Sequence, residues 1–387
     1  MKHLRIYFLA ILYLAAVCCT YPFDAEMKDS NDVPVVEGNI IIGSYSYISV
    51  DRIIKSSGKQ STAPLSFIVK VEGEDGTAVQ GTGDNPYQLD TRDLPATQKY
   101  RLVLTSTTDN SVYMTDFSTV LGTPEVDDFK YEITGNLLTF KVSLHSDSNP
   151  FFQISYDEEW EYHSWTDTKF VYNRNSNEIV AGNYPYYTCW NHSDYAKSTT
   201  MSAEAYEGFR LKDYPVLYMR NTDRRISTLY RLKMKVSLIP EDSYRYWQNL
   251  DKISQPDGDL FSPIPSSMRG NLYKEGDKNA LILGYVGFAA SHDISLFFNN
   301  EKEDFYVFPR SQVEYMLNDR KESGMDPEYW STLYSSGYWP YDTRSDIYGN
   351  TIGYIWITQD CVDCRRQGGS TTKPADWTNE STNKQEL

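Results

Sequence analysis

The chain has 387 residues, of which 53 are acidic and 37 basic, so its formal net charge is −16 at pH 7. Such an excess of carboxylates repels a phosphate backbone, and we expect no nucleic acid partner. Aromatic residues make up 14% of the chain, including 32 tyrosines. Because aromatic side chains fit the half-buried faces of β-sheets, the composition predicts an all-β protein.

The start of the chain has the pattern of an export signal. A short basic segment precedes an apolar run, 6–17, that is too short to cross a bilayer as a helix. The run ends at Cys18 and Cys19, and polar sequence follows at once, as in bacterial lipoproteins. We therefore predict that 1–18 is a lipoprotein signal peptide and that Cys19 is lipidated. Lipidation of Cys18 and an ordinary secretory peptide are the alternatives.

The first folded domain is predicted to follow a polar tether, 19–33. From 34 to 122, strand-like runs recur about every 8 to 12 residues, the spacing of a β-sandwich. Leu94 stands six residues before Tyr100 with a turn between them. This resembles the tyrosine corner, in which a phenol bonds to nearby backbone, so we expect an immunoglobulin-like sandwich.

A second, larger β domain is predicted over 123–387. An insertion rich in aromatic residues, 160–225, interrupts its strands, and its C-terminal region is rich in loops. Helix signals occur at 243–253 and 311–321. We therefore expect an interrupted sandwich with one or two short helices.

Several motifs stand in a fixed order along the mature chain, from the Pro-Phe pair after the first cysteines to a Cys-Val-Asp-Cys segment near the end: 19–23, Cys189-Trp190, 246–250, 258–265, 269–272, 283–287 and 361–365. In this order they resemble a Bacteroidetes lipoprotein family known as domain of unknown function 4249. The resemblance covers nearly all of the mature chain and supplies no catalytic residues.

Members of that family are often encoded beside TonB-dependent transporters of the outer membrane. The resemblance therefore implies a non-catalytic, lipid-anchored outer-membrane protein that is an accessory or ligand-capturing partner of such a transporter in nutrient uptake. We expect it at the cell surface, with the periplasmic face as the alternative. An independent surface glycan-binding protein and an unrecognised hydrolase are the other hypotheses.

The sequence contains no familiar catalytic motif, and we expect neither an enzyme nor a cofactor. Carboxylates at 157–161 could form the acid pair of a glycosidase, and 257–259 could offer oxygens to calcium. We interpret both segments as solvated turns. Cys361 and Cys364 have the spacing of a disulfide or of half a zinc site. No second pair completes a zinc site, so we expect a possible disulfide there, or simple thiols, and no metal. The pairing of Cys189, Cys361 and Cys364 stays open.

The aromatic insertion gives the strongest indication of a binding surface. Flat aromatic rings with polar tips suit the stacking of sugars or the contact with a glycan, peptide or protein partner. Five residues are the candidate contacts: Trp160, Trp165, Tyr186, Tyr187 and Trp190. The alternative is that these rings pack within long hairpins. A second aromatic group, 329–341, is interpreted in the same way.

Overall fold

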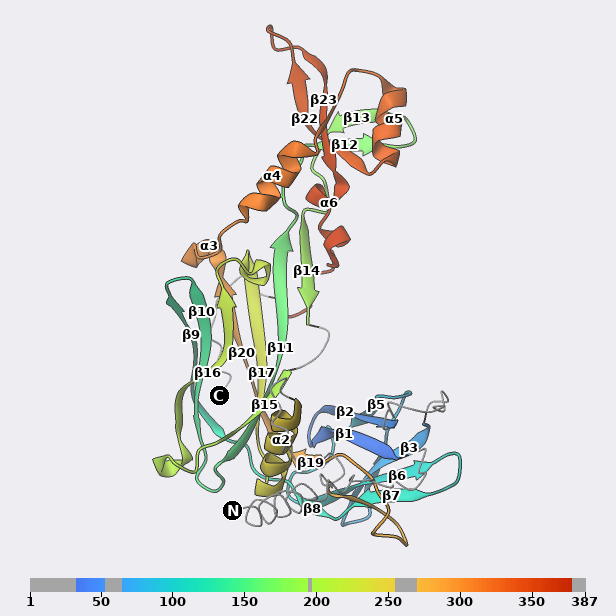
Figure 1. Cartoon of the computed structure of the whole chain (residues 1–387), viewed down its shortest axis with the longest axis vertical. Helices are drawn as coiled ribbons and strands as arrows, with labels where there is room; N and C mark the ends of the chain where they lie inside the picture. The colour runs from blue at the N-terminus through green and yellow to red at the C-terminus, as the bar shows by residue number, and fades with distance from the viewer. Residues whose placement is uncertain (1–32, 53–64, 194–196, 255–269, 378–387) are drawn as a thin grey trace, which may run out of the picture.

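The structure, a computed structural model, describes residues 33–52, 65–193, 197–254 and 270–377. The predicted signal peptide, Cys19, the tether and the 257–259 segment lie outside this part. Three bodies are arranged in the molecule (Figure 1): an N-terminal sandwich lies beside the lower end of a central sandwich, and a distal unit lies at the opposite end of the long axis. Among the described residues, no helix is both long and apolar enough to cross a membrane. The predicted all-β fold class is confirmed.

The N-terminal sandwich consists of two facing sheets. The first has the order β19-β1-β2-β5 and the second β18-β7-β6-β3-β4, with β8 beside β6. Their strands are β1 (Pro34–Ile41), β2 (Tyr45–Arg52), β3 (Phe67–Gly73), β4 (Ala78–Gln80), β5 (Tyr87–Asp90), β6 (Lys99–Ser106), β7 (Val112–Thr115), β8 (Ser118–Thr119), β18 (Leu272–Lys274) and β19 (Val286–Ala289).

The predicted tyrosine corner is present in this sandwich. Tyr100 is fully buried between the sheets, and its hydroxyl donates to the carbonyl oxygen of Pro95 at 2.6 Å. Its ring lies 6.4 Å from that of Phe288 on β19. The hydrogen bond ties the loop before β6 to the core of the domain.

The chain leaves the N-terminal sandwich near residue 122, but the sandwich is not confined to 34–122, because β18 and β19 also belong to it. β19 pairs with β1 in parallel, with Gly38 opposite Val286. At Gly284, just before β19, the backbone lies so close to β1 that a Cβ would be 1.8 Å from the carbonyl oxygen of Val36. Gly284 also has a φ of +108°, which residues with a side chain rarely adopt. A parallel pairing needs a long crossover, and here the connection contains every strand of the central sandwich except β20, which follows β19.

The central sandwich also has two facing sheets. One has the order β16-β10-β9, the other β14-β11-β17-β20, with β15 also beside β11. The strands are β9 (Glu125–Thr134), β10 (Leu137–His145), β11 (Phe151–His163), β14 (Thr188–His192), β15 (Lys197–Ser202), β16 (Leu211–Arg220), β17 (Leu229–Leu238) and β20 (Ser291–Asn299). Short 3-10 turns η1 (Glu207–Phe209) and η2 (Arg224–Ile226) flank β16.

Alternation along β17 explains how its sheet packs. Every second side chain enters the core between the sheets: Tyr230, Leu232, Met234 and Val236. The residues between them are basic: Arg231 and Lys233 pair with Glu159 on the outer face of β11, and Lys235 pairs with Asp293 of β20. This period of two is the sequence signal of a sheet with one buried face.

The distal unit is a third body, formed by 164–187 and 307–367. The predicted division into two domains did not include it. It contains the hairpin β12 (Phe170–Asn173) with β13 (Glu178–Ala181) and the sheet β21-β23-β22. Its remaining elements are α4 (Arg310–Asn318), β21 (Lys321–Ser323), α5 (Pro327–Ser335), β22 (Tyr338–Ser345), β23 (Thr351–Thr358), α6 (Gln359–Val362) and the 3-10 turn η4 (Cys364–Gln367).

Both aromatic groups of the sequence meet in the core of the distal unit. The buried rings are Tyr172, Tyr184, Trp330, Trp339, Tyr354 and Trp356. The first two come from the insertion and the others from the C-terminal region. For these residues the packing interpretation is therefore confirmed.

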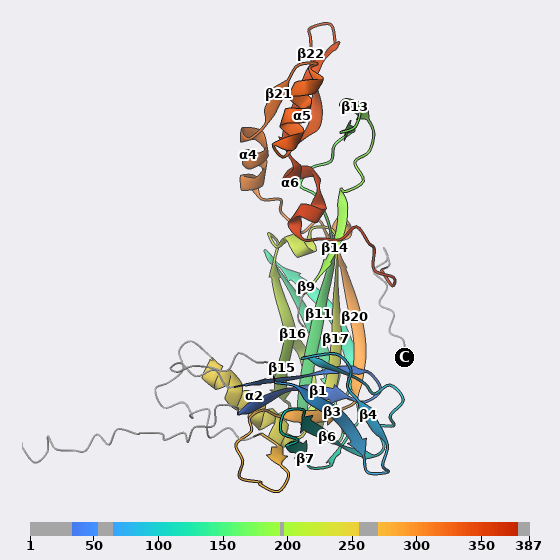
Figure 2. The ribbon, with the colours of Figure 1, turned by 90° about the vertical axis from the view of Figure 1, so that its right-hand side faces the viewer.

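Two of the described helices lie outside the distal unit. The helix α2 (Glu241–Ser254) confirms the first helix prediction, and its Tyr244 stacks on Phe151 of β11 at 4.9 Å. Tyr246 on the same helix lies 5.4 Å from Tyr285, next to β19. The helix thus packs where the two sandwiches meet, as Figure 2 shows from the side. The short α3 (Asn300–Glu303) follows β20.

Candidate functional site

Trp165, Tyr186 and Tyr187 have their ring faces occupied by groups of the same chain. The guanidinium carbon of Arg224 lies 3.7 Å from the ring centroid of Trp165, and that of Arg365 lies 3.2 Å from the Tyr186 ring. Tyr187 stacks on His163 at 4.4 Å. Each of these half-buried rings therefore already has a cation or another ring stacked on one of its faces. Little of the aromatic surface is left for a sugar to stack on.

The other two candidates, Trp160 and Trp190, are also half-buried. Trp160 stands on β11 and packs against the core of the central sandwich. The indole nitrogen of Trp190 donates to Glu161 at 3.1 Å, and that of Trp377 donates to the same carboxylate oxygen at 3.0 Å. Glu161 therefore fixes two indoles on the outer face of the central sandwich.

Trp377 ends a C-terminal strap, 368–377, that lies along the central sandwich. Trp190 and Ser370 exchange backbone hydrogen bonds of 2.8 Å. Asp376 accepts hydrogen bonds from Arg231, a residue of β17 whose side chain is otherwise paired with Glu159. The strap thus covers an acidic and basic cluster on the sheet.

The interpretation of 157–161 as a solvated turn is wrong, because the segment lies within β11. The Glu158 side chain is 1% exposed. Its carboxylate accepts a hydrogen bond of 2.9 Å from Tyr230 and forms ion pairs with Lys197 and Arg225. A solvated turn was expected because carboxylates are seldom buried unless they are paired. Here two cations supply the pairing.

The possible disulfide between Cys361 and Cys364 is not formed. Cys364 is bonded to Cys189 across 175 residues of sequence, with a Cα–Cα distance of 5.7 Å. Cys361 is a buried free thiol on α6 beside the Thr358 hydroxyl. The reason is geometric, since β14 brings Cys189 against η4 while α6 directs Cys361 into the core of the distal unit.

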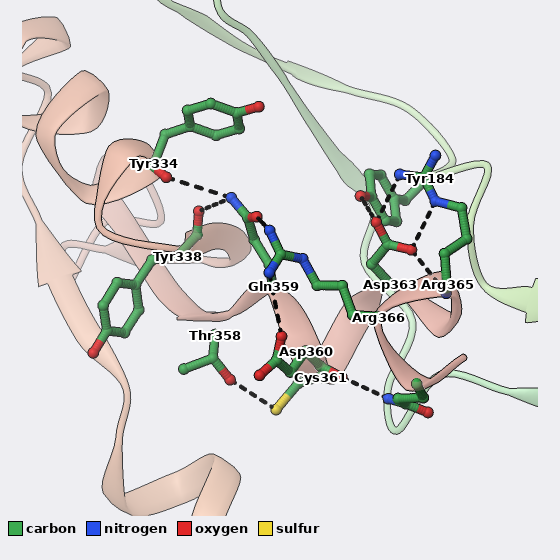
Figure 3. A network of polar contacts seen from close by, with 11 residues as sticks. Tyr184, Tyr334, Tyr338, Thr358, Gln359, Asp360, Cys361, Asp363, Arg365 and Arg366 are labelled. Atoms are coloured by element: carbon green, nitrogen blue, oxygen red, sulfur yellow. Dashed lines mark hydrogen bonds and ion pairs between the residues drawn. The ribbon is translucent and has the colours of Figure 1, made fainter. Parts of the chain in front are cut away.

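The residues on either side of Cys364 belong to a polar network at the base of the distal unit (Figure 3). Asp363 accepts two hydrogen bonds from the Arg365 guanidinium, at 3.0 and 2.7 Å, and one from Tyr184 at 3.2 Å. Burial raises the pKa of Tyr184 above its usual value, and the neighbouring carboxylate adds to the effect. Although burial opposes ionisation, the bonds from Arg365 hold the pKa of Asp363 below its usual value. The network fixes η4 to the insertion.

Exposed apolar side chains gather on the distal unit. This unit holds about a quarter of the described residues, yet it carries nine of the fifteen large hydrophobic side chains that are exposed: Val180, Val307, Phe308, Tyr315, Met325, Tyr329, Ile347, Tyr348 and Ile352. An excess of exposed apolar side chains on one part of a protein is a common mark of an interaction site. It makes the distal unit the candidate docking surface.

The two most exposed residues of this set stand at the tip of the hairpin formed by β22 and β23, which projects at the end of the molecule (Figure 1). Ile347 is 90% and Tyr348 82% exposed. Sequence reasoning missed both, since the C-terminal region was interpreted only as loops. The available signal was an apolar pair beside Gly349-Asn350, a turn dipeptide between two strand-like runs.

No group of three or more potential ligands for a metal ion occurs in the part of the chain that the structure describes. Single histidines lie in separate places there. His163 is half-buried under Tyr187, and burial lowers its pKa. His145 lies beside Asp127 at 3.1 Å on the edge of the central sandwich.

Fold and surface together define an elongated all-β protein with an apolar, mixed α/β unit at one end. The chain belongs to the family described as Domain of unknown function (DUF4249), which matches residues 20–295. This match includes both sandwiches and the aromatic insertion but stops within β20, before the C-terminal part of the distal unit. No curated protein matches the chain.

Two solved structures show weak similarity. Trypsin-activated alpha-2-macroglobulin from Escherichia coli is 13% identical over 55% of this chain and 15% of its own, with a TM-score of 0.17. A "putative carbohydrate binding protein" from Bacteroides uniformis is 9% identical over 53% of this chain and 89% of its own, with a TM-score of 0.13. The chain thus spans about a seventh of the first of these proteins.

Proposed function

We propose that the protein is a lipid-anchored, non-catalytic accessory of a TonB-dependent transporter in the outer membrane, and that the distal unit is its docking surface. The observation that carries the proposal is the gathering of nine exposed apolar side chains on that unit. Burying one such side chain in an interface contributes about 1.5–3 kcal/mol, so a few of them suffice for a specific contact.

The arrangement of the three bodies supports this role. The proposed anchor at Cys19 precedes Pro34, the first residue of β1, so the lipid is attached at the N-terminal sandwich. The distal unit lies at the opposite end of the long axis (Figures 1 and 2). A segment such as 20–33 spans at most about 50 Å. The protein is then held near the membrane at one end while the distal unit is free to meet the extramembrane parts of a barrel.

The test is a mild-detergent purification of the tagged, lipidated protein from its native outer membrane, followed by mass spectrometry. We expect a TonB-dependent barrel in near-stoichiometric amount. A protein that purifies alone rules out a stable complex with a transporter. Glycan binding by the isolated protein, lost in Trp160→Ala or Trp165→Ala, would instead support the glycan-binding hypothesis.

A further inference from the structure

We infer that the apex turn, Asp346–Asn350, is the element that holds the transporter, by inserting Ile347 and Tyr348 into an apolar pocket on the extramembrane face of the barrel. The inference rests on the proposed function and names the part of the chain and the kind of partner surface that perform it. Nothing else on the described surface projects apolar side chains so fully, since the next most exposed, Tyr47, Tyr206 and Tyr218, reach 56%.

The apex turn is ordered by its own hydrogen bonds. The Asp346 carboxylate accepts from the backbone nitrogens of Tyr348 and Asn350 at 2.9 and 2.8 Å and from the Asn350 amide at 3.0 Å. The Asp346 nitrogen donates to the Asn350 carbonyl at 2.9 Å. A turn held in this way presents its two apolar side chains without a large ordering cost on binding, which favours a specific contact.

The hairpin that carries the turn is braced at its base. β23 pairs with β21 as well as β22, and a Cβ at Gly353 would lie 1.9 Å from the carbonyl oxygen of Ser323. The Arg344 guanidinium donates to the same carbonyl at 3.3 Å and pairs with Glu322 at 3.1 Å. The tip is thus a rigid projection and not a loose loop.

Charge around the tip favours a protein pocket over a lipid surface. The hairpin carries Asp342 and Asp346, and its one cation, Arg344, is already paired with Glu322. Hydrogen bonds from Asn350 lower the pKa of Asp346, so this carboxylate is ionised at neutral pH. Anionic headgroups attract basic clusters and repel such a tip. A pocket with an apolar floor and basic groups at its rim complements it.

The test compares two double variants of the full lipidated chain in the purification described above. The apex variant is Ile347→Ser with Tyr348→Ser. The control variant is Ile68→Ser with Tyr47→Ser, the same pair of residue types exposed on the N-terminal sandwich. We expect the apex variant to recover at least tenfold less barrel than the wild type and the control to stay within twofold. Both variants are checked for wild-type circular dichroism and melting temperature.

A second measurement identifies what the tip touches. Photoreactive p-benzoylphenylalanine replaces Tyr348, or Tyr47 as the control site, and intact cells are irradiated. An adduct between position 348 and the barrel, absent at position 47, supports the inference. Adducts only with lipid or only with a second copy of this chain overturn it.

The two proposals fail in different ways. If the wild type and the apex variant bring down equal amounts of barrel, the apex turn is not the contact although the accessory role stands. If the wild type brings down no barrel at all, the proposed function fails and the inference falls with it.

Discussion

Glu158 shows at the scale of one residue how this chain uses its many carboxylates. Its side chain is buried and neutralised by Arg225 and Lys197. We predict that Glu158→Gln lowers the free energy of unfolding by about 2 kcal/mol, because both cations lose a partner although Arg225 keeps Asp223. Urea denaturation of the soluble chain beginning at Thr20 measures the change.

The matched control for that prediction is Glu132→Gln. Glu132 pairs with Lys141 on the surface of the central sandwich and is 53% exposed. Because water screens such a pair, its loss should cost no more than about 1 kcal/mol. Equal losses in the two variants would contradict the idea that the Glu158 cluster stabilises the sheet.

His163 should make stability depend on pH. Its pKa in the folded protein is lowered by burial, whereas the unfolded chain has a value of about 6.5. Below that pH the unfolded state binds more protons, so the folded state loses stability as pH falls from about 6.5 through the folded pKa. We predict that the free energy of unfolding decreases more between pH 7.5 and pH 5 in the wild type than in His163→Gln. An identical decrease in both would refute this.

Local sequence signals predicted some residues correctly and failed for others. The Tyr100 hydrogen bond was predictable because its acceptor, Pro95, lies five residues away. The burial and pairing of Glu158 were not predictable, since its partners Arg225 and Tyr230 lie 67 and 72 residues further along the chain. Patterns within a short window report the face of a strand, but not the charges that another strand places against it.

At the scale of elements, the disulfide between Cys189 and Cys364 holds η4 and the strap to β14. We predict that Cys189→Ala with Cys364→Ala lowers the free energy of unfolding by about 2–4 kcal/mol. The double variant should also become sensitive to trypsin in the distal unit, because the network around Asp363 loses its covalent support.

Thiol titration gives an independent check of this pairing. The soluble chain from Thr20 contains three cysteines. We expect no reactive thiol in the native protein and one after denaturation, which Cys361→Ala removes. Reactivity of Cys189 in the denatured wild type would show that the disulfide is formed differently.

Helices and strands were predictable where the pattern of apolar and polar residues continues along the whole element. The expected helix at 311–321 corresponds to α4, whereas α5 was missed although Asp326 caps it and Pro327 occupies its first turn. The apolar run 281–288 is typical of a strand, and β19 forms there, but the run does not identify the partner of that strand. Periodicity specifies that a strand has a buried face, and it does not specify which sheet supplies the neighbouring edge.

At the scale of the whole molecule, the distal unit was the least predictable feature. Its two segments, 164–187 and 307–367, are separated by most of the central sandwich and share one aromatic core. Composition signalled the aromatic residues but could not distinguish a binding surface from this core. Eight of the nine exposed apolar side chains lie in 307–367, and the sequence alone does not separate them from the buried ones.

The central claim, that the distal unit meets the transporter, is tested most directly by lysine crosslinking of intact outer membranes with identification of the linked peptides. Lys169 and Lys321 are exposed on the distal unit, and Lys99 on the N-terminal sandwich is exposed to about the same degree as Lys321. We predict links from Lys169 or Lys321 to extramembrane segments of a TonB-dependent barrel. Barrel links confined to Lys99, or no link to a barrel from any lysine of the chain, would contradict the claim.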